Sequence, residues 1–378
     1  MSPARFLGAA AVAAALALPA AAPAQSFLSA RGLGYPLEPT DARARALGGI
    51  TTGLPESRFS LVNPAELAGL PAAGLSVTMH GDRTEASGVD ADGFETTRFP
   101  AIQLALPFGE RLVASLGYAS ALDQNWTATR FDSVTVAGSR RLVTDRFSSQ
   151  GGVGRLRAGA AYRVHPRVDV GAALDLYTGA LRDSTIRSVE GLTGTSLGTR
   201  YEWRGTGFSG GARWRGEALT LSAAVAGGGA LRVAPQDSGA IEGRYSMPLR
   251  VDAGATARIA QRALLAVSGR WTGWSAAEAD LDGTAARDVV QATAGVELEG
   301  LQLVGRPLPL RFGARMTQLP FAWAGSEYPD ERALTAGAGV RFAGGAALLD
   351  LGAERGTRGG GLDESFWRVS LSLSLLGR

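Results

Sequence analysis

The fold is decided by the stretch Phe366-Trp367-Arg368-Val369-Ser370-Leu371-Ser372-Leu373-Ser374-Leu375. Successive side chains of a β-strand point to opposite faces of the sheet, so every second residue shares one face. One face of this strand carries Trp367 and aliphatic residues, and the other carries Arg368 and three serines. Such a strand suits a wall between lipid and a polar interior. The same alternation recurs along the chain.

The first 24 residues have the composition of an export signal. Arg5 supplies the positive charge, an apolar stretch runs from Leu7 to Leu18, and Ala22-Pro23-Ala24 forms a cleavage site before Gln25. The apolar stretch is too short and too rich in alanine for a spanning helix. We therefore expect residues 1–24 to be a signal peptide, with an uncleaved helical anchor as the alternative.

Composition restricts the class of protein further. The 52 glycines are scattered along the chain, which favours an all-β protein with many turns and close backbone contacts. Beyond the signal no run of 18 apolar residues occurs, which excludes membrane-spanning helices. The net charge is only +3 and arginines alternate with acids, so we expect no nucleic-acid partner. Without cysteine, no disulfide forms.

Alternation of apolar and polar residues predicts fourteen strands, an even number as in single-chain bacterial barrels. We therefore expect an all-β fold, a transmembrane antiparallel β-barrel over residues 73–378. The predicted strands cover residues 75–83, 98–107, 111–121, 152–164, 167–181, 200–215, 217–230, 247–260, 262–275, 286–299, 308–320, 332–343, 346–356 and 365–377.

The connections between these strands alternate in length. Short turns are expected near Phe108, Pro166, Gly216, Gln261 and Gly344. This alternation is typical of outer-membrane barrels, in which short turns face the periplasm and long loops face outward. A soluble sandwich, the alternative, would lack it. Only the connection 300–307 is ambiguous, and the longer connections cover residues 84–97, 122–151, 182–199, 231–246, 276–285, 321–331 and 357–364.

Charged residues lie on the inner faces of the predicted strands. Charges in a confined lumen should pair, because an unpaired desolvated ion is costly. The hairpin at Gly344-Gly345 would place Arg341 diagonally across from Asp350, and Glu297 precedes Arg311 by one strand. A selective pore lining and an ion-paired scaffold for the barrel and its plug both remain open. The expected lumen charge network comprises Arg157, Arg250, Asp252, Glu297, Arg311, Arg315, Arg341 and Asp350.

Residues 25–72 precede the first strand and lack its alternation. A short helix is predicted within 41–49 and is ended by Gly48 and Gly49. Because a fourteen-strand barrel is wide enough to need filling, we expect this segment to plug the lumen. A tail hanging in the periplasm is the alternative.

A second short helix is predicted after Asn63. This residue is a favourable N-cap, and Pro64 suits the first helical position. Glu66, at the third position, would complete a capping-box-like pair with Asn63. Gly69 and Pro71 limit the helix to about two turns.

The N-terminal segment resembles a known family through Arg45-Ala46-Leu47-Gly48-Gly49-Ile50-Thr51-Thr52-Gly53, followed by Asn63-Pro64-Ala65-Glu66-Leu67. These runs resemble the hatch of FadL-type outer-membrane transporters and, equally, that of the related PorV-type barrels. The match covers about residues 41–70, with Gly48, Gly49, Asn63, Pro64, Ala65 and Glu66 as hatch residues, and the strand count extends it. The FadL resemblance implies passive uptake of small hydrophobic compounds such as long-chain fatty acids. The PorV alternative implies a protein-secretion partner or surface scaffold.

The resemblance also implies a location and partners. The location is the outer membrane of a diderm bacterium, and the partners are its lipid, a hydrophobic ligand and the barrel assembly machinery. In the FadL type, ligand caught among the outer loops passes to an apolar pocket and leaves when the hatch shifts, often sideways through the wall. Candidate ligand contacts in the loops are Trp126, Phe131, Phe321 and Trp323, although packing within the loops explains them equally well.

Catalysis is not expected. Hydrolytic chemistry generally needs a histidine or paired acids near a nucleophile. His80 and His165 are the two histidines, neither has a partner visible in the sequence, and we expect both to be solvated. The sequence has no metal-ligand cluster and no phosphate loop, so we expect no enzyme activity, no metal ion and no cofactor.

Overall fold

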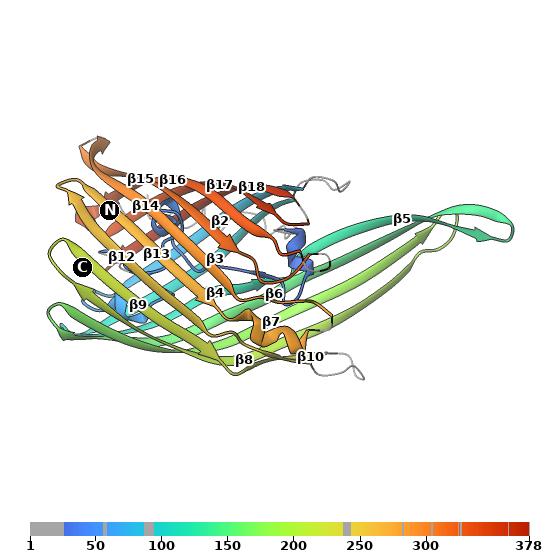
Figure 1. Cartoon of the computed structure of the whole chain (residues 1–378), viewed down its shortest axis with the longest axis horizontal. Coiled ribbons are helices and arrows are strands. Elements are labelled where there is room, and N and C mark those ends of the chain that lie inside the picture. Colours follow the sequence, from blue (N-terminus) through green and yellow to red (C-terminus); the bar gives the residue numbers. More distant parts are fainter. Residues whose placement is uncertain are drawn as a thin grey trace, which may run out of the picture.

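The computed structural model describes residues 26–55, 59–86, 94–236, 243–281, 283–303, 305–323, 325, 327–361 and 363–377. Within these residues, fourteen antiparallel strands form a closed barrel around a short N-terminal segment, as predicted (Figure 1). The barrel strands are β2 (Gly74–Ala86), β3 (Phe94–Phe108), β4 (Leu112–Asp123), β6 (Ser139–His165), β7 (Val168–Val189), β8 (Thr195–Arg215), β9 (Leu219–Gly228), β12 (Arg250–Ala260), β13 (Ala263–Thr272), β14 (Val289–Leu303), β15 (Arg306–Gln318), β16 (Asp330–Phe342), β17 (Ala347–Gly359) and β18 (Glu364–Leu376). The chain closes where β18 pairs with β2.

The remaining elements are short pieces at the two ends and inside the barrel. None of the described helices is both long and apolar enough to cross a membrane. These elements are η1 (Phe27–Ala30), β1 (Tyr35–Pro36), α2 (Ala42–Ala46), η2 (Pro64–Leu67), β5 (Trp126–Val136), β10 (Ala230–Pro235), β11 (Gly243–Ser246), η3 (Trp274–Asp280) and η4 (Ala343–Gly345).

The two faces of the wall differ as the sequence predicts. On β18, Trp367, Val369 and Leu371 are exposed on the outer face. Arg368 and Ser370 on the same strand are buried in the lumen. An apolar exterior and a polar interior are what a strand needs when one side meets hydrocarbon and the other a polar lumen.

Connection lengths alternate around the barrel as expected. We call the end with the short turns the short-turn rim (left in Figure 1) and the opposite end the long-loop rim. The ambiguous connection 300–307 also belongs to the short turns, because β14 continues to Leu303 and β15 begins at Arg306. Strand β14 thus ends later, and β15 begins earlier, than the sequence pattern predicted.

The expected long loops at 122–151 and 182–199 are wrong. These residues continue the β-structure: β5 forms a hairpin with the outer half of β6, and β7 and β8 extend beside it beyond the long-loop rim (Figure 1). We call residues 126–149 and 183–199 the projecting sheet. Its tip turns at Ala137 and Gly138, which have positive φ values of 50° and 81°, the geometry of a tight hairpin turn.

Residues 26–55 and 59–73, which we call the plug, lie inside the barrel (blue in Figure 1). Helix α2 packs against β15–β18, and η2 packs against β6–β8. Glycines in the wall permit this contact. A Cβ on Gly313 would lie 2.3 Å from the Leu47 carbonyl carbon, and one on Gly211 would lie 2.1 Å from the side-chain oxygen of Asn63. The absence of side chains at these wall glycines therefore lets the backbone of the plug lie directly against the strands.

We predict that Gly313→Ala displaces the plug. The new methyl group would collide with the backbone of Leu47 and Gly48, which cannot rotate away as a flexible side chain can. Protease cleavage within the plug and single-channel conductance in planar bilayers should both rise. The matched control is Gly81→Ala, because nothing lies within 4 Å of a Cβ at Gly81. Equal behaviour of the two variants would show that the plug does not depend on this close contact.

Candidate functional site

Helix α2 ends before glycines as the sequence predicts, and its start is fixed by a cap that the sequence analysis did not name. The Asp41 carboxylate caps its start by accepting a hydrogen bond from the Ala44 N–H at 2.7 Å. The helix ends at Ala46, and Gly48 and Gly49 follow with positive φ values of 88° and 81°. This short helix directs Arg43 and Arg45 toward acids of the wall.

The predicted N-cap at Asn63 is confirmed, but the capping box is wrong. Asn63 accepts from the Ala65 N–H at 3.0 Å, and its own N–H is satisfied by Ser60 instead of Glu66. Glu66 accepts from Thr52 and from the Gly53 N–H at 2.6 Å. The helix is one 3-10 turn instead of two. The Asn63 amide also reaches the wall, where it donates to the carbonyls of Ala212 and Ala223 and to Ser222.

Buried ion pairs connect the plug to the wall, and the first group surrounds Arg43. Its Nε and Nη2 atoms donate to Glu297 of β14 at 2.9 and 2.7 Å. Glu297 also accepts from Arg311 at 2.5 Å, and Arg311 donates to Asp350 at 2.6 Å. The structure therefore brings three of the expected network residues together around a cation of the plug.

Arg341 lies apart from this group. In the register of β16 with β17 it is diagonal to Asp350, as the hairpin predicted, but the carboxylate of Asp350 binds Arg311 instead. The side chain of Arg341 is exposed near the short-turn rim. Asp350 therefore does not bind the arginine on the adjacent strand. Arg311, two strands away on β15, reaches its carboxylate instead.

A second group joins the plug to β15–β17. The Tyr35 hydroxyl donates to Glu331 at 2.5 Å, and Arg315 donates to the same carboxylate at 2.7 Å. Arg315 also binds Glu354, which lies 3.4 Å from Arg45 of α2. These side chains are nearly all buried, so each depends on its partner for the hydrogen bonds that water would otherwise make.

His80 is buried and not solvated, contrary to the expectation. Its Nε2 atom accepts from Arg45 Nε at 3.2 Å. The plug covers this inner face of β2, which the strand pattern alone does not reveal. His165 is exposed in its turn, and its Nδ1 atom accepts from the Arg167 N–H at 3.2 Å. Among the described residues, no group of three or more His, Cys, Asp or Glu side chains can hold a metal ion.

A third group binds the middle of the plug through its backbone. Arg157 makes a bidentate ion pair with Asp175, in which Nε and Nη2 each donate to one carboxylate oxygen at 2.7 Å. Its Nη1 atom donates to the Leu61 carbonyl at 2.7 Å, and Arg155 donates to the same carbonyl at 2.9 Å. Two wall arginines therefore share one carboxylate and one plug carbonyl.

Arg250 and Asp252, both expected in the network, lie together with a residue that the sequence analysis missed. Arg270 Nε donates to Asp252 at 2.6 Å, and its Nη1 atom donates to Glu38 of the plug at 3.0 Å. Asp252 and Arg270 face each other across β12 and β13. The turn at Gln261 does not reveal this pair, because a β-bulge between Arg258 and Ala260 shifts the register by one residue. The Nη2 atoms of Arg250 and Arg270 are buried and, within the described residues, lack a hydrogen-bond partner.

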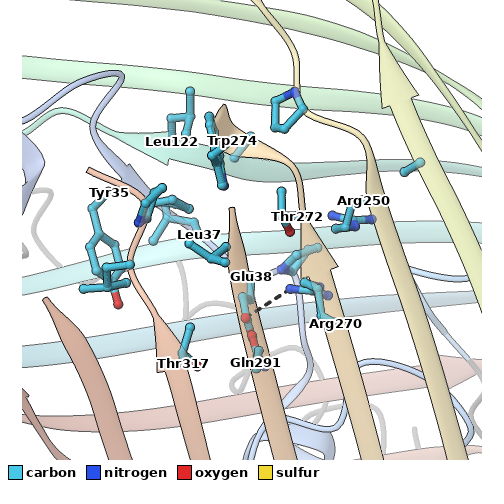
Figure 2. A pocket seen from close by; sticks show the side chains of 18 of the residues that line it. Tyr35, Leu37, Glu38, Leu122, Arg250, Arg270, Thr272, Trp274, Gln291 and Thr317 are labelled. Atoms are coloured by element: carbon cyan, nitrogen blue, oxygen red, sulfur yellow. Dashed lines mark hydrogen bonds and ion pairs between the residues drawn. The ribbon is translucent and has the colours of Figure 1, made fainter. Parts of the chain in front are cut away.

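These arginines line a cavity of about 150 Å³ between the plug and the long-loop rim (Figure 2). Its apolar walls include Leu37 of the plug, Leu122 of β4 and Trp274 of η3, which face Arg250 and Arg270 across the cavity. Leu122 and Trp274 belong to a larger buried apolar cluster near this rim. The cavity therefore combines an apolar surface with buried guanidinium groups that have spare donors.

The four expected aromatic contacts lie in different places. Trp126 and Phe131 belong to β5 of the projecting sheet, where Phe131 is 75% exposed. Phe321 is buried and packs edge-to-face on Trp274, with the ring centroids 5.3 Å apart. It therefore holds a side chain that lines the cavity in place. Trp323 stacks against Arg31 of the plug. Of the residues that line the cavity, Arg250 and Arg315 were expected in the lumen, whereas Leu37, Leu122 and Trp274 were missed because they lie in segments far apart in the sequence.

We predict a pH dependence that comes from Asp41. Burial, with a smaller contribution from the Asp350 carboxylate, raises the pKa of Asp41 to about 6. A raised folded-state pKa gives stability that is complete at low pH and is lost as the pH rises through 6. Between pH 5 and pH 7.5 the loss should be about 1.4 kcal/mol, the free energy of one pKa unit.

Asp41→Asn is the matched variant, because asparagine keeps the N-cap and does not titrate. Thermal melting should show a smaller decrease in midpoint from pH 5 to pH 7.5 for this variant than for the wild type. An identical pH dependence in both proteins would contradict the role of Asp41.

Several solved structures have a similar fold. The fold is similar to a FadL homologue from Pseudomonas aeruginosa, with TM-score 0.61 and 15% identity over 90% of this chain and 99% of that chain. The CymD monoaromatic hydrocarbon channel gives TM-score 0.59 and 14% identity over 89% and 97% of the two chains. The toluene transporter TodX from Pseudomonas putida gives TM-score 0.57 and 14% identity over 90% of this chain and 98% of that chain. At these identities the likeness concerns the fold.

None of the curated proteins compared with the chain matches it. The family model BamG matches residues 4–226. Because that match spans more than half of the 378 residues, and the barrel has the FadL-type fold, the chain belongs to the BamG family.

Proposed function

We propose that the protein is an outer-membrane channel for the passive entry of small hydrophobic compounds, with long-chain fatty acids and similar amphiphiles as its ligands. The observation that carries the proposal is the cavity in which Leu37, Leu122 and Trp274 face Arg250 and Arg270. An apolar tail gains free energy by leaving water for such walls, at about 25 cal/mol per Å² of buried apolar area. A carboxylate gains charge-assisted hydrogen bonds from the spare guanidinium donors.

The orientation follows from the two rims. Short turns of such barrels face the periplasm, so the long-loop rim and the cavity beside it face the exterior. A compound arriving from outside would meet the cavity first. Below it, α2 and η2 fill the lumen, with Gly48, Gly49, Asn63, Pro64, Ala65 and Glu66 as the hatch segment. Passage along the axis would require this hatch to move.

A sideways route through the wall would require only the two-residue strand β1 to move, instead of the whole hatch segment. The ladder between β3 and β4 ends at the pair Ala101–Ala119, next to Pro100, which has no N–H to donate. Beyond that pair, β4 is joined instead by β1 of the plug, through Leu122 and Asp123. Leu122 also lines the cavity. A ligand could therefore leave toward the membrane if β1 released β4.

We predict that the purified protein contains bound lipid or detergent in native mass spectrometry and carries labelled fatty acid into liposomes. Arg250→Gln should reduce fatty-acid entry severalfold and leave an uncharged hydrocarbon such as toluene unaffected, because only the carboxylate uses the guanidinium. Arg341→Gln is the control, since it removes the same charge from an exposed site at the opposite rim. An empty lumen and no uptake would exclude a transport function.

A second candidate is a secretion partner or surface scaffold, and the projecting sheet favours it. Strand β5 pairs with β6 on one side, and within the described residues no strand covers its other edge. Phe131, Leu142 and Leu197 are exposed there at 75, 66 and 73%. Free edges and apolar side chains are what β-strand addition uses. Stable co-purification of a secreted protein, together with an empty lumen, would favour this candidate.

A further inference from the structure

The opposite end of the lumen contains a second cavity, of about 410 Å³, near the short-turn rim. Its walls come from the end of the plug, Leu67 to Leu70, and from β6, β8, β9 and β12. Three of its lining residues are arginines: Arg163 of β6, and Arg213 and Arg215 of β8, the strands on either side of β7. It is separated from the cavity at the long-loop rim by the hatch segment, so it is a distinct site.

The three arginines converge on one carboxylate. Asp169 of β7 is fully buried, and its Oδ1 atom accepts from Arg163 Nε at 3.2 Å and from Arg215 Nη2 at 3.1 Å. Its Oδ2 atom accepts from Arg213 Nη2 at 2.8 Å. One negative charge therefore faces three positive charges, and the register of β6, β7 and β8 fixes this ratio.

Two of the three arginines also bind the plug, whereas Arg215 Nη2 donates to the Pro166 carbonyl of the short turn at 3.2 Å. Arg163 Nη2 and Arg213 Nη2 each donate to the Ala68 carbonyl at 3.1 Å. The approach is close enough that a Cβ on Gly69 would lie 1.5 Å from Arg163 Nη2. A neutral carbonyl satisfies hydrogen bonds but cancels no charge. The Nε atom of Arg215 is buried and lacks a hydrogen-bond partner within the described residues.

Within the described residues, no acid other than Asp169 pairs with these three arginines. Glu66 also lines the cavity, but its carboxylate accepts from Thr52 and the Gly53 N–H. Glu217 lines it too, with a side chain that is 95% exposed and lies 3.9 Å from Arg167 on the rim. A further cation, Arg258, lines the same cavity and lies 3.7 Å from Glu299. Like charges confined in a partly buried site raise its affinity for an anion.

We propose that this cavity binds a single carboxylate or phosphate group, held by Arg163, Arg213 and Arg215. An anion seated there would compete with the Ala68 carbonyl for the same two guanidinium donors and so weaken the attachment of the plug end. The site is independent of which compounds enter at the other rim. The anion can be free in solution, the head of a departing amphiphile or the phosphate of a lipid, since all three present the same group.

The test is isothermal titration calorimetry on the full barrel in neutral detergent, with inorganic phosphate and with octanoate as probes. Saturable binding is expected, weakened about tenfold in Arg215→Gln, the factor for losing one charge-assisted hydrogen bond. Arg215 is about one-third exposed, so the variant should keep its fold. Arg167→Gln, which removes a charge from the same rim outside the cavity, is the control and should bind as the wild type.

The probes separate the sources of the anion. Phosphate and octanoate binding alike supports a site for a free anion, and octanoate binding alone supports the head of an amphiphile. Loss of phosphate and octanoate binding in nanodiscs of phosphatidylglycerol, but not in nanodiscs of zwitterionic phosphatidylcholine, supports an anionic lipid headgroup that already fills the site. No saturable binding to the wild type, or equal weakening by Arg215→Gln and Arg167→Gln, would overturn the proposal.

Discussion

Arginines in a confined lumen need partners, and the rest of the interior depends on this requirement. Fourteen strands enclose a space too wide for their own side chains to fill. Arg157 and Arg213 have acidic partners on the wall, yet both also require carbonyls of the plug, Leu61 and Ala68. In return Arg43 of the plug requires Glu297 of the wall. Removing one partner of a buried pair typically costs about 3–5 kcal/mol, so plug and wall form one electrostatic unit.

These attachments are unevenly distributed along the plug. Helix α2 is held by two groups of ion pairs and by backbone contact with wall glycines. Near the cavity at the long-loop rim, β1 meets β4 through only two residue pairs, and Glu38 binds Arg270. Local opening begins where few buried contacts must break. Opening beside that cavity would have to break the β1–β4 pairs, the Glu38–Arg270 ion pair and the hydrogen bond from Tyr35 to Glu331.

Much of this structure follows from the sequence because a barrel strand is a local pattern. Alternation with period two predicts the strands and places Glu297 one strand before Arg311. That these two residues stand directly opposite each other does not follow, because a β-bulge between Leu298 and Leu301 shifts the register from that at the turn. Contacts between plug and wall, such as that of Arg45 with His80, do not follow either. The preference of Asp350 for Arg311 over Arg341 also escapes the pattern, because it joins strands that are not adjacent.

The loop prediction at 122–151 failed for another reason. The predicted strands make this segment a connection between two of them, but threonine and valine along β5 favour a strand once β6 offers an edge. The same error hid how far the strands extend. Sequence patterns predict that a strand exists more reliably than where it ends.

The length of the projecting sheet has a consequence for how the protein meets its surroundings. Strand β6 has 27 residues, or roughly 90 Å at about 3.3 Å per residue, whereas about 10 residues suffice to cross a bilayer. In an outer membrane the hairpin tip at Ala137 and Gly138 would stand clear of the lipid headgroups and of the sugars attached to them. Antibodies and bacteriophages would reach this tip before any other part of the molecule, and an epitope inserted there would label intact cells.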